Sequence, residues 1–247
     1  MSFLLNNFLI CQRSIAVLID PEKFKFQNSE LFFEKLRLAD PNFIFIGGST
    51  VSKVDFDFCI STIKKNINFP IIIFPGASHQ ISSLADGILL LSLISGRNPD
   101  YLIGHHIAAA EELNEMQIEI IPTSYILVDG GRKTSVEYIS QTTPLPSDQD
   151  ALARRIALAG KLQGKQITYL DAGSGANNTI SSSMIERVKS IGSPLIVGGG
   201  IRCVEEIERC HKAGANIVVI GNAVEDNIDF LLDIANYQKL NRNLTTL

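Results

Sequence analysis

The sequence predicts an α/β protein that folds as a single (β/α)8 barrel, a TIM barrel, over residues 1–247. Short runs of β-branched and aliphatic residues recur along the whole chain, and stretches with a helical pattern separate most of them. The runs are almost continuously apolar, as is typical of parallel strands that are covered on both faces. Strands and helices that alternate in this way over about 250 residues favour a closed barrel.

The expected strands, in order, are Ile15–Ile19, Phe43–Ile46, Pro70–Phe74, Gly87–Leu93, Ile118–Val128, Ile167–Leu170, Pro194–Val197 and Asn216–Ile220. The expected helices are Ser29–Ala39, Lys53–Asn66, Asp100–Glu112, Ser147–Gln163, Ile180–Ser190, Val204–Ala213 and Ala223–Ala235. Gly214 follows the pattern at Val204–Ala213, where a C-cap glycine is expected.

The interval between the third and fourth strands is the weak point of the pattern. His79–Ala85 is short, so the third helix is expected to be a single turn or absent. An open, doubly wound sheet is the alternative fold. It would have fewer strands and a GxGxxG motif after the first strand, where this sequence has Asp20-Pro21-Glu22-Lys23.

The composition narrows the classes of partner. Hydrophobic residues make up 45% of the chain and charged residues 19%, with a formal net charge of −4 and no cluster of Lys and Arg. This balance argues against a nucleic-acid partner and favours a small ligand. The longest apolar run, Gly87–Ile94, is far shorter than the roughly 20 residues that span a bilayer. The four cysteines show no CxxC pair, which favours reduced thiols in a cytoplasmic protein.

Glycine-rich segments follow the last three expected strands. They are Gly173-Ser174-Gly175, Gly198-Gly199-Gly200 and Gly221-Asn222. Glycine lets backbone N–H groups approach an anion closely, and loops after strands 7 and 8 of such barrels often hold phosphate. Taken alone, the triple glycine fits an ordinary tight turn, but the three loops together predict a phosphate site.

Three polar residues at other strand ends are candidates for catalysis. Asp20 and Ser49 follow adjacent strands, so their oxygens are expected to converge on a Mg²⁺ ion. Asp171 ends the sixth strand, across the barrel mouth from Asp20, where a general base would be separate from the metal. The plainer alternatives are an Asp-Pro turn or helix N-cap for Asp20 and a loop-capping role for Asp171. His105-His106 lies in an expected helix without an acidic partner, and a surface or interface pair is expected there.

The same segments resemble a known family. The segments that carry the resemblance are Leu18–Lys23, Gly47–Thr50, Pro122–Gly131, Tyr169–Gly175, Val197–Arg202 and Gly221–Ala223. Together they are similar to the geranylgeranylglyceryl phosphate synthase family, and they extend over nearly the whole barrel. The segment Tyr169–Gly175 is specific to this family, whereas the glycine loops alone fit many phosphate-binding barrels.

The resemblance implies a Mg²⁺-dependent prenyltransferase. Such enzymes join an allylic prenyl diphosphate, here expected to be geranylgeranyl diphosphate, to the C3 hydroxyl of sn-glycerol 1-phosphate. Asp20 and Ser49 match the Mg²⁺ positions, and Asp171 matches the proposed base. The positions that match the glycerol phosphate site are Tyr169, Asp171, Gly173, Ser174, Gly175, Gly199, Gly200, Gly221 and Asn222. A homo-oligomer and transient membrane contact are also implied.

One departure from the family concerns the expected base. Relatives commonly carry Glu where this chain has Asp171, so the carboxylate is one methylene shorter and needs a different pose. Two other functions fit the phosphate-binding loops. One is a different barrel enzyme, an isomerase or lyase that needs no metal and no lipid groove. The other is a non-catalytic barrel that binds a phosphorylated metabolite.

Overall fold

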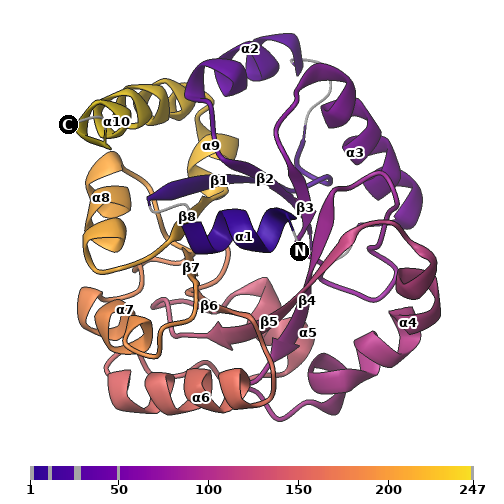
Figure 1. The fold of residues 1–247 in the computed structure, drawn as a ribbon, viewed down its shortest axis with the longest axis vertical. Coiled ribbons are helices and arrows are strands. Elements are labelled where there is room, and N and C mark those ends of the chain that lie inside the picture. The colour runs from indigo at the N-terminus through magenta and orange to yellow at the C-terminus, as the bar shows by residue number, and fades with distance from the viewer. Residues whose placement is uncertain (1–2, 11–12, 25–28, 49–50, 246–247) are drawn as a thin grey trace.

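A computed structural model describes residues 3–10, 13–24, 29–48 and 51–245. Eight parallel strands close into a barrel in which each strand pairs with the next and β8 pairs with β1 (Figure 1). The strands are β1 Ser14–Ile19, β2 Phe43–Ile46, β3 Ile71–Ile73, β4 Gly87–Leu93, β5 Glu119–Leu127, β6 Ile167–Asp171, β7 Leu195–Gly198 and β8 Ile217–Ile220. The predicted (β/α)8 barrel is therefore confirmed, with strand ends that differ from the expected ones by at most one residue.

Helices surround the strands in a ring (Figure 1). They are α2 Ser29–Ala39, α3 Lys53–Asn66, α4 His105–Glu115, α5 Ser135–Ser140, α6 Asp150–Leu162, α7 Ser182–Lys189, α8 Val204–Lys212, α9 Asn222–Asp226 and α10 Phe230–Thr245. A π-helical turn, η2 Asp100–Gly104, leads into α4. In the described segment 74–86, between β3 and β4, no helix forms, as expected.

The helix expected at Ala223–Ala235 is two helices in the structure. Asn227 has an extended backbone and separates α9 from α10. Its side-chain oxygen accepts a hydrogen bond from the N–H of Asp229 at 2.9 Å. Asn side chains compete in this way with the helical backbone bonds, which explains the break.

The apolar side chains form two layers. One lies between the strands and the surrounding helices, and the other fills the barrel. The interior layer includes the large rings of Phe43, Phe45, Tyr125 and Tyr169, all of which are buried. Alternation of side chains along each strand produces the two layers, because both faces of a barrel strand are covered.

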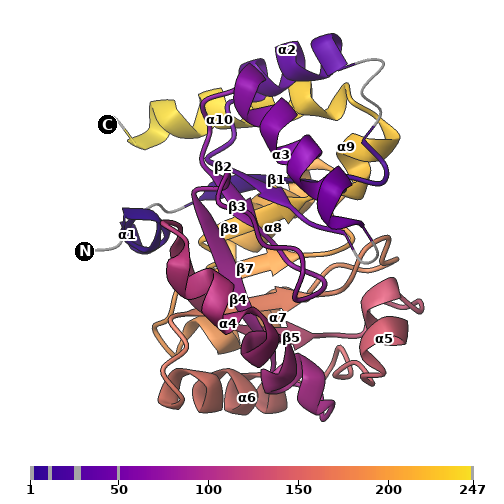
Figure 2. The same ribbon diagram turned by 90° about the vertical axis from the view of Figure 1, so that its right-hand side faces the viewer.

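Helix α1, Phe3–Ile10, was not expected from the sequence. It lies across the amino ends of the strands, at the centre of Figure 1 and at the left of Figure 2, opposite α5 and α9. Leu4 and Phe8 are buried in the interior layer, and the Phe8 ring centroid is 4.7 Å from that of Phe43. The Glu119 carboxylate accepts hydrogen bonds from the N–H groups of Leu4 and Leu5. Helix α1 therefore covers the end of the barrel that is remote from the glycine-rich loops.

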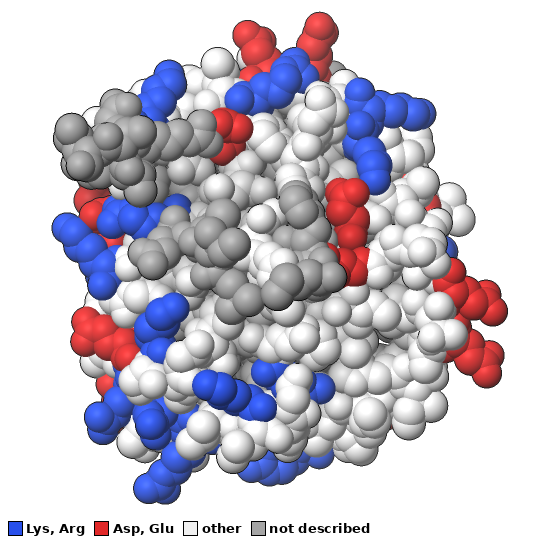
Figure 3. All heavy atoms as spheres, in the orientation of Figure 1, with Lys and Arg blue, Asp and Glu red and all other residues white. Residues whose placement is uncertain are grey.

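Charged side chains lie mainly toward the rim of the α1 face, and a largely uncharged surface extends over the lower right of this view (Figure 3). Helix α4 lies in the same region of Figure 1. Ile107 of α4 is 70% exposed, and Ile103 of the preceding turn η2 is 53% exposed. Of the helices in the described ranges, none combines the length and the apolarity that a membrane crossing requires.

Candidate active site

A cavity of about 360 Å³ opens at the carboxyl ends of the strands, where the sequence predicts the active site. One part of its lining is polar and comes from the loops after β1, β6, β7 and β8. The other part is apolar and comes from β4, η2, α4 and the loop that follows β3. The cavity is therefore suited to a ligand, or a pair of ligands, with one charged end and one hydrocarbon end.

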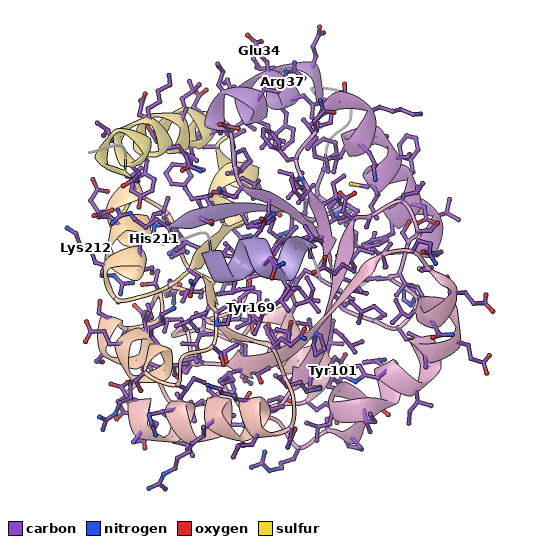
Figure 4. All side chains as sticks on the ribbon, viewed as in Figure 1. Glu34, Arg37, Tyr101, Tyr169, His211 and Lys212 are labelled. Atoms are coloured by element: carbon purple, nitrogen blue, oxygen red, sulfur yellow. The ribbon has the colours of Figure 1, made fainter. Side chains whose placement is uncertain are left out.

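Asp171 lies at the bottom of the cavity, where β6 ends. Its side chain is only 6% exposed, and both carboxylate oxygens accept hydrogen bonds. The Tyr125 hydroxyl donates to Oδ2 at 2.6 Å, and the Gly173 N–H donates to Oδ1 at 2.8 Å. Strands β5 and β6 pair with Tyr125 opposite Tyr169, whose ring centroids are 5.5 Å apart. The Tyr169 side chain lies inside the ring of strands, and Tyr101 lies beside α4 (Figure 4).

The three ionisable groups around this point have shifted pKa values. Burial raises the pKa of Asp171, and the hydrogen bonds from Tyr125 and Gly173 partly oppose this effect. Burial and the Asp171 charge raise the pKa values of Tyr125 and Tyr169 well above the ordinary value. The hydroxyls of Tyr125 and Tyr169 therefore stay protonated, and toward a carboxylate they act as hydrogen-bond donors. Asp171 is more basic than an exposed aspartate. These are the properties of a group that accepts a proton.

The glycine loops form the wall of the cavity nearest β6, β7 and β8. Gly199 and Gly200 have positive φ values of 87° and 74°. A Cβ at Gly199 would lie 2.7 Å from the nitrogen of Gly173, so only glycine lets these two loops approach so closely. The N–H groups of Gly199 and Gly200 have no hydrogen-bond acceptor among the described residues. Free N–H groups that line a cavity are suited to an anion.

Asn222 connects the loop after β8 to the loop after β6. Its side-chain oxygen accepts hydrogen bonds from the N–H of Gly175 at 2.7 Å and from the hydroxyl of Ser174 at 3.1 Å. Gly221 also lines the cavity. Of the residues predicted for the phosphate site, Tyr169, Asp171, Ser174, Gly175, Gly199, Gly200, Gly221 and Asn222 line this one cavity, and Gly173 binds Asp171 beside it.

Asp20 lines the cavity where β1 ends. Its Oδ1 accepts a hydrogen bond from the Glu22 N–H at 3.0 Å, and its Oδ2 lies 3.9 Å from the Lys23 ammonium. Burial raises the pKa of Asp20, although the Glu22 N–H and the Lys23 charge lower it. Gly48 lies beside the carboxylate, because a Cβ there would be 2.6 Å from Oδ1. Ser49, the other predicted metal ligand, lies outside the described residues.

The apolar part of the cavity exists because the third helix is missing. Ile88 and Leu90 point outward from β4, toward a position that a helix after β3 would cover in a complete barrel. Here the loop at 74–86 and α4 cover them instead, and Ala109 and Leu113 of α4 line the cavity. The cavity thus continues from the barrel mouth into the gap between this loop and α4.

Sequence reasoning missed several residues of the site. His105 and His106 line the cavity, contrary to the expected surface pair, and His106 Nε2 lies 2.7 Å from the carbonyl oxygen of Leu91. Leu91 belongs to β4, so this contact joins the start of α4 to that strand, while the His105 ring packs edge-on against Tyr101 at 4.8 Å. The sequence patterns assigned no role to Tyr125. It lies two residues before the end of β5, and a tyrosine at such a position in the barrel interior indicates a hydroxyl near the site.

Comparisons with known proteins show the family of this chain. The model of the PcrB family matches residues 9–238. The geranylgeranylglyceryl phosphate synthase of Zunongwangia profunda is 50% identical over 218 residues, which cover 88% of this chain and 93% of that protein. The enzyme of the same name from Chitinophaga pinensis is 44% identical over 224 residues, which cover 90% and 89%.

A solved structure is also similar. It is the crystal structure of (S)-3-O-geranylgeranylglyceryl phosphate synthase from Thermoplasma acidophilum in complex with its substrate sn-glycerol-1-phosphate. The two chains are 32% identical and superpose with a TM-score of 0.88 over 95% of this chain and 96% of that one. This chain belongs to the PcrB family, together with the geranylgeranylglyceryl phosphate synthases, and it is an enzyme of the prenyltransferase class.

Proposed function

We propose that this protein joins geranylgeranyl diphosphate, or a prenyl diphosphate of similar length, to the C3 hydroxyl of sn-glycerol 1-phosphate in a Mg²⁺-dependent reaction. The products are an ether lipid precursor and diphosphate. The observation that carries the proposal is the two-ended cavity, which is polar at the glycine loops and apolar between β4 and α4, with Asp171 between the two ends. The Thermoplasma acidophilum relative that binds sn-glycerol-1-phosphate supports it.

The polar end is suited to the phosphate of the acceptor. The free N–H groups of Gly199 and Gly200 would donate to the phosphate oxygens. The glycerol chain would then extend toward the barrel axis, where Tyr169 and Asp171 line the cavity. In this pose a hydroxyl of the acceptor lies within reach of the carboxylate, as general base catalysis requires.

The apolar end is suited to the prenyl tail. Ile88, Leu90, Ala109 and Leu113 present hydrocarbon surface along the gap that the missing helix leaves. Burying a long isoprenoid there removes a large apolar area from water, which contributes roughly 25 cal/mol per Å². The donor's diphosphate would remain at the mouth, near Asp20 and Lys23.

Asp20 fits a role as a ligand of Mg²⁺. Its side chain is 17% exposed at the cavity wall, and burial raises its pKa although the Glu22 N–H and the Lys23 charge lower it. The described residues contain no group of three or more Asp, Glu, His or Cys side chains that could hold a metal. Mg²⁺ is commonly bound by one or two carboxylates together with substrate phosphates, so a single Asp20 is compatible. When bound, the ion would neutralise the charge that develops on the departing diphosphate.

The residues of this chain would then orient the acceptor and take up its proton. As the allylic C–O bond of the donor breaks, the C3 hydroxyl attacks the allylic carbon, and orientation provides much of the rate. Asp171 would accept the hydroxyl proton, and its raised pKa makes it a better base than an exposed aspartate. Tyr125 keeps the carboxylate in place through the 2.6 Å hydrogen bond.

Incubation of the purified protein with Mg²⁺, radiolabelled sn-glycerol 1-phosphate and prenyl diphosphates from C15 to C35 tests the proposal. Label that becomes extractable into organic solvent is the expected result, and the chain length used most rapidly measures the apolar end of the cavity. Binding of sn-glycerol 1-phosphate without transfer from any donor would refute the proposed reaction. Self-association and transient membrane contact stay predictions, which sedimentation velocity and vesicle flotation can test.

A further inference from the structure

A carboxylate that has no role in the reaction above connects two loops at the mouth of the cavity. Glu225, on α9, lines the cavity, and its side chain is 19% exposed. Its Oε2 accepts a hydrogen bond from Asn222 Nδ2 at 3.0 Å and another from Lys23 Nζ at 2.8 Å. Lys23 belongs to the loop after β1, and Asn222 is the first residue of α9, directly after Gly221 at the end of β8. A negative charge beside an anion site repels the anion and weakens its binding unless a cation offsets it.

The partners of the Asn222 carboxamide fix its orientation. Its oxygen accepts from the Gly175 N–H and the Ser174 hydroxyl, while its NH₂ group donates to Glu225. If the carboxamide rotated by half a turn, its oxygen would face the Glu225 carboxylate and its NH₂ group would face the Gly175 N–H. Both new contacts would be repulsive, so Glu225 stabilises one orientation over the other.

Lys23 balances the charge of Glu225. Burial lowers the pKa of Lys23, but the hydrogen bond to Glu225 and the charges of Glu225, Asp20 and Asp226 together raise it above its ordinary value. The ammonium lies closer to Glu225, at 2.8 Å, than to Asp20, at 3.9 Å. The ion pair therefore offsets the negative charge of Glu225 at the edge of the proposed phosphate site.

We propose that Glu225 is a positioning residue for the acceptor phosphate and acts through Asn222. By fixing the carboxamide, it holds the loop of Ser174 and Gly175 against the loop after β8 before the substrate binds. Gly175 has a φ value of 70°, and a glycine loop of this kind is costly to order at the moment of binding. The inference rests on the proposed function and deepens it, because it names the residue that organises the phosphate site.

Two substitutions separate positioning from charge. Glu225→Gln and Glu225→Ala remove the same charge, but only glutamine keeps an oxygen that can accept from Asn222. Calorimetric titration with sn-glycerol 1-phosphate is expected to show about tenfold weaker binding for Glu225→Ala, as the loss of one hydrogen bond implies. Glu225→Gln is expected to stay within about threefold of the wild type. In turnover, Glu225→Ala should raise the KM for the acceptor more than it lowers kcat.

Asp226→Asn is the matched control. Asp226 is an exposed acid on the same helix, and no hydrogen bond of its side chain is found among the described residues. Its substitution is expected to leave the affinity unchanged. Wild-type affinity in Glu225→Ala would overturn the inference, and so would an equal loss in the Gln and Ala variants, which would assign the effect to charge alone.

The outcome also distinguishes this inference from the proposed function. If the wild type binds sn-glycerol 1-phosphate but transfers no prenyl group, the reaction is wrong and the titrations still decide the role of Glu225. If the wild type does not bind sn-glycerol 1-phosphate, the proposed acceptor is wrong, and inorganic phosphate replaces it in the same three variants with the same criteria. If the wild type binds neither ligand, both proposals fail.

Discussion

Removal of the Tyr125 hydroxyl tests the assignment of Asp171 as the base. In Tyr125→Phe the ring remains in the interior layer, but Asp171 Oδ2 loses the hydroxyl that donates to it at 2.6 Å. That hydrogen bond favours the charged form of the carboxylate and lowers its pKa, in opposition to burial. Its loss should therefore raise the pKa of Asp171 further.

The size of the shift follows from the strength of the bond. A hydrogen bond to a charged group contributes about 1.5–3 kcal/mol. Because one pKa unit corresponds to about 1.36 kcal/mol, the pKa should rise by about one to two units. The base must be ionised to accept a proton, so activity falls as the pH drops through its pKa. The acid limb of the pH profile of kcat/KM should move to higher pH by the same one to two units.

Tyr169→Phe is the comparison for this experiment. It removes a hydroxyl from the neighbouring buried ring but leaves the bond between Tyr125 and Asp171 intact. Its effect is expected on the KM for the acceptor, with a smaller change in the acid limb. Melting temperatures of both variants show whether the barrel is preserved. An acid limb that stays at the wild-type position in Tyr125→Phe would refute the assignment of Asp171 as the base.

Three further substitutions test other parts of the site. Asp171→Asn should lower kcat by at least about a hundredfold, with little change in the acceptor affinity that calorimetry measures. Because burial raises the pKa of Asp171 in the folded protein, this carboxyl stabilises the fold only at low pH, and the contribution is lost as the pH rises. The melting temperature of Asp171→Asn at pH 7 should therefore not fall below that of the wild type. Asp20→Ala should weaken binding of a prenyl diphosphate in the presence of Mg²⁺ but not in its absence. If the titrations of Asp20→Ala and the wild type in Mg²⁺ are identical, the metal role of Asp20 is excluded. Ala109→Trp should shorten the longest prenyl chain that is used, as the product profile measures, because Ala109 lines the apolar end.

The barrel could be predicted from the sequence because its strands are short, continuously apolar and regularly spaced. The eight runs end within one residue of the strands, and the short His79–Ala85 interval predicted a third helix that is a single turn or absent. Helix α1 could not be predicted in this way, because its apolar residues show little helical periodicity. Its position depends on Leu4 and Phe8 entering the barrel and on a capping carboxylate, Glu119, far away in the sequence.

The site was predictable where it consists of strand ends and unpredictable where it depends on contacts across strands. Glycine loops and Asp171 could be found because each follows directly after a strand. The partner of Asp171 could not, because Tyr125 is one of several buried residues of β5 and only the register between β5 and β6 brings its hydroxyl to the carboxylate. The positions of His106 and Glu225 at the cavity likewise depend on contacts between distant segments, His106 with Leu91 and Glu225 with Lys23.

The order of the strands determines how the two substrates would meet. In a closed barrel with sequential strands, β3 and β4 lie across the mouth from β7 and β8. The apolar end of the cavity borders the first pair and the free glycine N–H groups border the second, so the tail of the donor and the phosphate of the acceptor would lie on opposite sides. Asp171, on β6, lies at the floor between them, held by Tyr125 of β5. Two ligands anchored in this way can only bring their reactive ends together above that carboxylate, and orientation of this kind supplies much of the rate of a bimolecular reaction.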